Sequence, residues 1–118
     1  SYGLHGRKEV SPDDLSPGHF AFFKNLRPYY EKDDFILVHA GLRPGVSLAE
    51  QSLDDLIWIR FEFIKSDFDF GKIVIFGHTP LSKTAPFYGA EKVGIDTGAV
   101  YGGRLTCLEL PSMRLYQV

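Results

Sequence analysis

Two short apolar runs, each ending at a histidine, constrain the fold of this chain more than any other feature. The first covers residues 35–38 and ends at His39, and the second covers residues 73–76 and reaches His78 after Gly77. Continuous apolar runs of this length are typical of buried strands. A buried strand that stops at a histidine brings an imidazole to the rim of a sheet, where the ligand sites of open α/β folds collect. Because neutral imidazole is the commonest protein metal ligand, the repeated pattern predicts a metal site.

The composition indicates one folded domain over residues 1–118. Hydrophobic residues make up 44% of the chain and aromatic residues 14%, which is enough for a sizeable core. The net charge of −2 gives no electrostatic case for nucleic acid or a membrane surface, and no apolar run approaches the roughly 20 residues that span a bilayer. The single cysteine, Cys107, excludes an internal disulfide and fits a reducing cytoplasm. We therefore expect a cytoplasmic protein without nucleic-acid or membrane partners.

Local signals predict a mixed α/β fold. Ser16 followed by Pro17 predicts a short amphipathic helix over residues 17–26. Ser52 with Asp55 resembles a capping box and predicts a helix from residue 53 through Arg60 toward residue 64. After residue 80 the pattern is all-β, with strands expected at 92–95, 104–110 and 114–118 as a meander. Cys107 lies within one of these strands, and its side chain is expected to be buried as a small apolar group.

Several side chains are candidates for chemistry. His39 and His78 are interpreted as a pair of metal ligands, because Ala40 and Gly41 would let an ion approach the backbone closely. For either histidine taken alone, a ring that bonds a neighbouring carbonyl is the favoured interpretation, and only the pair favours metal binding. Asp96 could lie near them, or could bond the backbone of its own turn. The available ligands are too few for a complete site, since catalytic zinc usually has three protein ligands.

Arg60 is the candidate for binding phosphate. It follows an apolar stretch of the predicted helix, and its planar fork suits a phosphate group. An ion pair with Glu62 is the alternative, at even odds from the sequence. Arg43 and Arg104 are interpreted as surface charges.

These residues also carry a resemblance. Four motifs occur in order: His-Ala-Gly at 39–41, Asp-Leu-Ile-Trp-Ile-Arg at 55–60, Gly-His-Thr-Pro at 77–80, and Ile-Asp-Thr-Gly-Ala at 95–99 with Gly-Gly-Arg-Leu-Thr at 102–106. Together they resemble the C-terminal half of calcineurin-like metallophosphoesterases. The nearest branch is that of the bacterial serine/threonine protein phosphatases, with the diadenosine tetraphosphatases nearby.

The resemblance implies a β-sandwich flanked by helices and a two-metal hydrolase that uses Mn²⁺, Fe or Zn²⁺. His39 and His78 match the two histidines that hold the second ion, and Arg60 matches an arginine that grips the substrate phosphate. The implied substrates are phosphoserine or phosphothreonine proteins, or other phosphomonoesters. Dinucleoside polyphosphates are the alternative substrates, although the Trp-Ile-Arg context favours the phosphatase branch.

The sequence departs from the family in one large respect. The Asp-x-His, Gly-Asp-x-x-Asp-Arg-Gly and Asn-His-Glu runs of the family's N-terminal half do not occur in it. We therefore expect a C-terminal portion of the domain that is inactive alone. It would self-associate or pair with the N-terminal half, because a sheet shared with that half would expose apolar surface. A non-catalytic metal- or partner-binding module is the remaining alternative.

Overall fold

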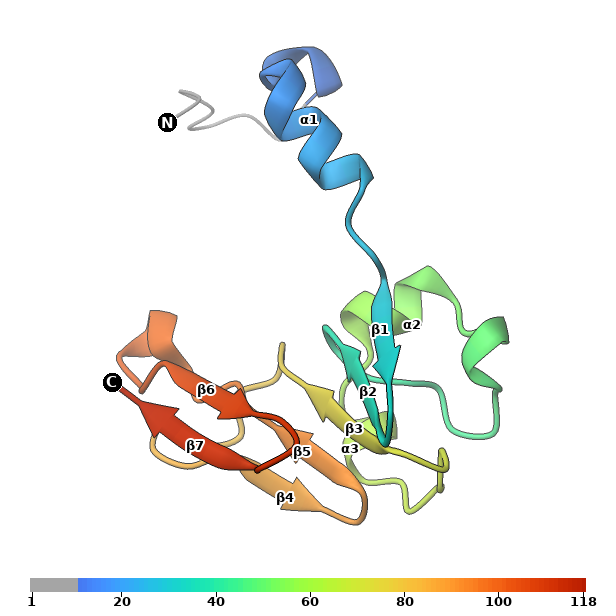
Figure 1. Cartoon of the computed structure of the whole chain (residues 1–118), viewed down its shortest axis with the longest axis vertical. Coiled ribbons are helices and arrows are strands. Elements are labelled where there is room, and N and C mark those ends of the chain that lie inside the picture. Colours follow the sequence, from blue (N-terminus) through green and yellow to red (C-terminus); the bar gives the residue numbers. More distant parts are fainter. Residues whose placement is uncertain (1–10) are drawn as a thin grey trace.

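In the computed structural model, which describes residues 11–118, seven short strands form two sheets (Figure 1). The larger sheet has the order β1 (Tyr29–Lys32), β2 (Phe35–Val38), β3 (Ile73–Phe76), β5 (Lys92–Gly94) and β4 (Phe87–Gly89). The smaller sheet is the hairpin of β6 (Thr106–Glu109) and β7 (Arg114–Gln117). The pairs β2–β3 and β3–β5 are parallel, and the edge strands β1 and β4 pair antiparallel. The sheet centre is therefore parallel, as expected for buried apolar strands.

Helices cover one face of the large sheet. They are α2 (Leu53–Trp58) and α3 (Phe61–Ile64), with the 3₁₀ turn η2 (Leu48–Glu50) before them. Leu56, Ile59 and Phe63 pack with Ile36 and Val74 in one apolar cluster, and Phe63 is fully buried. This packing fixes the helices against the two strands that end at the histidines.

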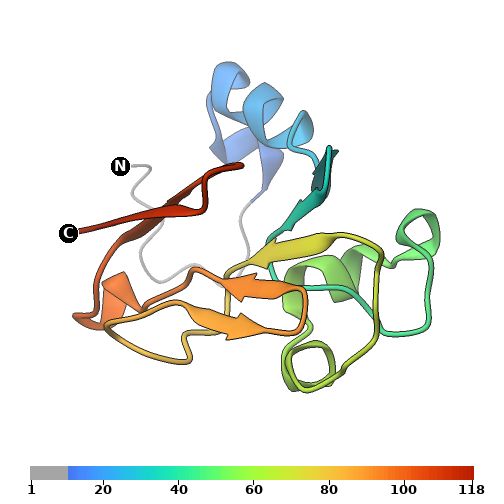
Figure 2. The same cartoon turned by 60° about the horizontal axis from the view of Figure 1, so that its bottom comes forward.

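The hairpin β6–β7 covers part of the other face (Figure 2). Leu108, Leu110 and Met113 pack against Phe35 and Ile75 of the large sheet. The two sheets with flanking helices confirm the predicted mixed α/β sandwich, and the C-terminal strands form a separate hairpin rather than one meander. The reason is the 3₁₀ turn η3 (Ala99–Tyr101), which lies between β5 and β6 and carries the chain to the second layer.

Helix α1 (Pro17–Lys24) projects from the sheets on the segment that leads into β1 (Figure 1). The hydroxyl of Ser16 accepts a hydrogen bond from the His19 N–H, and Pro17 occupies the first turn, as the sequence predicts. No residue of α1 is buried, so the expected apolar face of this helix has no cover within residues 11–118. The short 3₁₀ turn η1 (Pro12–Asp14) precedes it, and residues 1–10 lie outside the described part.

Two local predictions were wrong. The helix expected over residues 53–64 is two helices, broken at Ile59 and Arg60, whose backbone angles (ψ 144° and φ −130°, ψ −106°) are not helical. Cys107 is exposed rather than buried, because it lies on the opposite face of β6 from Leu108, which packs against the large sheet. No helix within residues 11–118 has the length and apolar character needed to cross a membrane.

Candidate metal and phosphate site

The parallel ladder brings the two strand-end histidines together. Leu37 of β2 lies opposite Ile75 of β3, and the ladder continues one step further, where the Gly77 N–H donates to the His39 carbonyl at 2.9 Å. His78 follows directly. The two residues are therefore neighbours at the carboxyl ends of adjacent parallel strands, where α/β folds place ligands.

The side chains of these histidines converge. Nε2 of His39 lies 3.1 Å from Nδ1 of His78, and the ring centroids are 4.9 Å apart. His78 has a positive φ of 66°, a left-handed conformation that a non-glycine residue rarely adopts. Strained backbone of this kind persists where the surroundings hold it, and it is concentrated at functional sites. Here it accompanies a ring nitrogen turned toward the neighbouring imidazole.

The surroundings of His78 favour the neutral ring. Burial lowers its pKa, and the positive charges of Arg60 and His39 lower it further, while Asp96 acts in the opposite direction. Trp58 packs edge-on against the ring, with centroids 5.4 Å apart. Nε2 of His78 is buried and has no hydrogen-bond partner among residues 11–118. A neutral imidazole is the form that binds metals.

The separation of the two nitrogens suits a hydrogen bond between the rings, and it is also short enough for two ligands of one ion. Nitrogen–metal bonds are about 2.0–2.1 Å long, so two nitrogens 3.1 Å apart can bind the same ion. The described residues hold no group of three or more metal-binding side chains. The Asp96 carboxylate accepts a hydrogen bond from the Gly98 N–H at 2.9 Å. Of the two alternatives for Asp96, this is the one in which the side chain bonds the backbone of its own turn. The residues present thus fit part of a metal site and supply two imidazoles to it.

Arg60 lies at the break between α2 and α3. It is exposed, and within residues 11–118 its side chain forms no hydrogen bond or ion pair. Glu62, which was its expected alternative partner, binds Arg43 instead at 3.1 Å. Arg60 is also close enough to lower the pKa of His78. Arg60 thus lies two residues after Trp58, which packs on the His78 ring, and its guanidinium has no partner within residues 11–118.

The small residues after His39 serve the core and not a ligand. Ala40 is fully buried, and its N–H donates to the Leu56 carbonyl of α2 at 2.9 Å. Gly41 has φ 155°, and a Cβ at this position would lie 2.4 Å from the Phe63 ring. The expectation that these residues open space for an ion is wrong. Residues of α2 and α3 pack directly against Ala40 and Gly41 and fill the space beside them.

Sequence reasoning missed Arg43. Its guanidinium binds Asp55 at 2.5 Å and Glu62 at 3.1 Å, although the sequence reading treats it as a surface charge. The capping pair Ser52 and Asp55 was visible as a helix start, but nothing local indicates that Asp55 also has an arginine partner. That contact depends on how the loop after His39 folds onto α2.

An open groove runs beside the histidine pair on the sheet face away from the helices. Its volume is about 410 Å³, and its floor includes Leu37, Ile75 and Ile95, with His39 and Gly77 at one end. The sheet thus has uncovered apolar surface that reaches the candidate metal site.

Part of the chain is similar in sequence to curated dinucleoside tetraphosphatases. A 45-residue stretch is 47% identical to the asymmetrical bis(5'-nucleosyl)-tetraphosphatase PrpE of Bacillus thuringiensis (strain Al Hakam), and the same holds for that of Bacillus cereus (strain AH820). The predicted resemblance is confirmed. The matched stretch covers 38% of this chain and only 18% of either relative. No family model matches the chain.

The fold has a counterpart among solved structures. A crystal structure provisionally assigned as a diadenosine tetraphosphatase superimposes with a TM-score of 0.76 over 90% of this chain, at 20% sequence identity. The chain spans 56% of that structure. At this identity the likeness shows the fold, which is that of a longer protein of which this chain corresponds to a little over half.

Proposed function

We propose that this chain provides one side of a two-metal phosphoesterase centre. His39 and His78 hold one divalent ion through Nε2 and Nδ1, and Arg60 binds the phosphate of the substrate. The observation that carries the proposal is the 3.1 Å separation of these two nitrogens at the ends of adjacent strands. The similarity to dinucleoside tetraphosphatases supports the same chemistry.

Each residue has a distinct task in this proposal. The two imidazoles fix the position of the ion, and the strained backbone of His78 keeps its ring in place. Arg60 offers a planar pair of donors to phosphate oxygens and neutralises their charge. A divalent ion bound there lowers the pKa of a bound water and neutralises charge on the phosphoryl group. Manganese is the proposed ion, with iron or zinc as the other candidates.

Two substrate classes fit this site equally. The Trp-Ile-Arg segment that ends at Arg60 favours phosphoserine and phosphothreonine, as in the protein phosphatases that the sequence resembles. The names of the similar proteins favour dinucleoside polyphosphates. Turnover of a phosphopeptide and of diadenosine tetraphosphate by the longest natural protein that contains this chain separates them.

Metal binding by the chain itself is the first test. In a titration with Mn²⁺ followed by NMR, the ring signals of His39 and His78 should broaden together at the lowest metal concentration. His39→Ala and His78→Ala should each abolish the shared effect, while His19→Ala on helix α1 leaves it unchanged. Equal broadening of all three histidine signals would contradict the proposed site.

Activity of the chain alone is a separate question. We expect no phosphatase turnover in the presence of Mn²⁺, because two imidazoles hold an ion weakly and a two-metal reaction needs carboxylate ligands around both ions. Such a chain would act as the metal-binding portion of a larger assembly. Turnover by the isolated chain that is lost in His78→Ala would contradict this expectation and show that the chain is active without a partner.

A further inference from the structure

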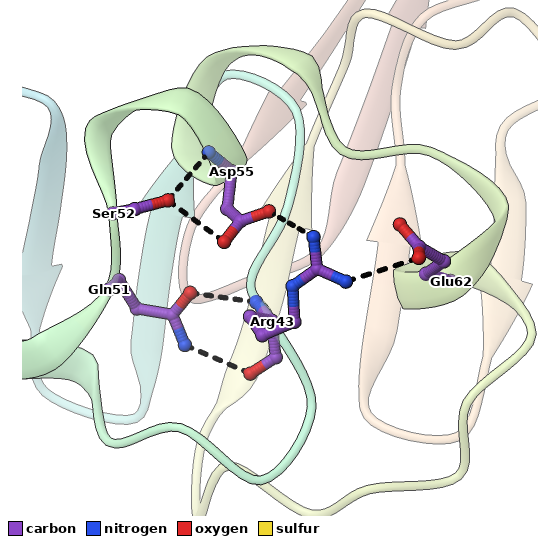
Figure 3. Close-up of polar contacts among 5 residues, drawn as sticks. All are labelled: Arg43, Gln51, Ser52, Asp55 and Glu62. Atoms are coloured by element: carbon purple, nitrogen blue, oxygen red, sulfur yellow. Dashed lines mark hydrogen bonds and ion pairs between the residues drawn. The ribbon is translucent and has the colours of Figure 1, made fainter.

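Arg43 connects the two helices on either side of Arg60 (Figure 3). Its Nη2 lies 2.5 Å from Oδ1 of Asp55 in α2, and its Nη1 lies 3.1 Å from Oε1 of Glu62 in α3. In a continuous helix these two acids, seven residues apart, would be separated by about 10 Å along the axis. The break at Arg60 lets a single guanidinium reach both.

The position of Arg43 is itself fixed. The Gln51 side chain accepts from the Arg43 N–H at 2.7 Å and donates to the Arg43 carbonyl at 3.0 Å (Figure 3). The hydroxyl of Ser52 donates to the second oxygen of Asp55 at 2.8 Å. Both the backbone of the arginine and the carboxylate that it binds are therefore held by further hydrogen bonds.

The two acids are the nearest to Arg60 in sequence on either side. Both are occupied by Arg43, and Arg60 has no ion pair within residues 11–118. Because Arg60 precedes α3, the helical spacing that keeps residues i and i+2 apart does not hold its side chain away from Glu62. Without Arg43, Glu62 would compete with phosphate for the Arg60 guanidinium.

We propose that Arg43 is a positioning residue that keeps Arg60 available for phosphate by binding Asp55 and Glu62. The inference rests on the phosphate-binding role of Arg60 proposed above. The contribution of the two contacts differs, since the Asp55 side chain is 18% exposed and that of Glu62 is 67% exposed. The Glu62 contact is weaker and more sensitive to salt.

The experiment measures the Arg60 side chain directly. The Nε–Hε NMR signal of Arg60, assigned with Arg60→Lys, is recorded first without ligand and then during titration with inorganic phosphate at low salt. In Arg43→Met the ligand-free signal should shift as Arg60 pairs with Glu62. The phosphate dissociation constant should rise about two- to fivefold, the range expected for competition from a partly exposed carboxylate.

Rescue separates competition from a general structural role. Glu62→Gln in the Arg43→Met background should return both the ligand-free signal and the phosphate affinity toward those of the unsubstituted chain. In an Arg60→Ala background, Arg43→Met should no longer change the phosphate affinity. A structural defect would persist in the double variant, because removing Glu62 restores no packing.

A matched pair controls for net charge. Lys72 and Glu31 form an ion pair of 2.9 Å at the start of β3, the end of the strand opposite to His78. Lys72→Met and Glu31→Gln repeat the same charge changes there and should leave phosphate binding by Arg60 unchanged. Equal effects from the two pairs would overturn the inference, since net charge would then account for both.

The outcomes distinguish this inference from the proposed function. If the Arg60 signal does not respond to phosphate in the unsubstituted chain, the phosphate-binding role of Arg60 fails. If it responds, but Arg43→Met leaves the ligand-free Arg60 signal in place or the Glu62→Gln rescue is absent, the positioning role of Arg43 fails.

Discussion

The backbone conformation of His78 lowers the stability of the fold and at the same time positions its side chain beside His39. Its φ of 66° places it where a side chain costs about 1–2 kcal/mol relative to the ordinary helical conformation. The same conformation brings Nδ1 within 3.1 Å of His39. A residue free of functional demand at this turn would be expected to be glycine, which adopts positive φ without a steric penalty.

Substitution of His78 tests this cost. We expect His78→Gly to be more stable than His78→Ala by about 1 kcal/mol, because relief of the left-handed strain outweighs the extra entropy of glycine in the unfolded chain. Urea unfolding of both variants, followed by the fluorescence of Trp58, measures the difference. At a position with negative φ the order is the reverse, so an alanine variant of equal or greater stability would contradict the prediction.

Lys92 illustrates how a strand and a helix are coupled. This β5 residue is buried, and its Nζ donates to the carbonyls of Phe63 and Ser66 at the end of α3. The ammonium also lies 4.8 Å from the centre of the Phe63 ring. Burial lowers the pKa of Lys92, while the two carbonyls compensate in part for its lost hydration. The lysine thereby holds the C-terminal end of the helix that begins at Arg60.

We expect Lys92→Met to lower the free energy of unfolding by about 1–3 kcal/mol, the cost of leaving buried carbonyl oxygens without a donor. Urea unfolding measures it. Lys72→Met is the matched control, because Lys72 forms only a surface ion pair and should change the stability little. Equal losses in the two variants would show that the buried contacts contribute nothing specific.

Those helices and strands could be predicted from the sequence that are specified by a few consecutive residues. The apolar runs at β2 and β3 and the Ser52 cap of α2 each depend on a few consecutive residues, and all three are present. The break at Arg60 could not be predicted, because it is accompanied by contacts from Arg43, seventeen residues earlier in the chain. Gly77 and Pro80 mark a turn around His78, but they do not indicate that His78 itself has the left-handed conformation.

At the scale of the whole molecule, uncovered apolar surface is the main feature. The groove beside His39 lies on the open sheet face, and Phe22 and Phe23 of α1 are 62% and 54% exposed. Exposed apolar surface on this scale indicates an interaction with another protein surface. We therefore predict that the isolated chain self-associates.

Size-exclusion chromatography with light scattering should give a mass above that of one chain. The double substitution Phe22→Ser and Phe23→Ser should shift it toward the monomer, because it removes two of the largest exposed apolar side chains. Val100→Ser is the control, since Val100 is 85% exposed on the separate turn η3. A folded monomer in the unsubstituted chain would refute the prediction.

The parallel pairing of β2 and β3 has a consequence for how this chain can vary. The distance between the two imidazoles is set by the ladder at one end of the strands, whereas the exposed Asp67 and Phe68 lie in the connection at the other end. Extra residues there cost only loop-closure entropy, about 0.6 kcal/mol for each doubling of loop length. This connection is therefore where the chain can be lengthened, cut or labelled without moving the histidines.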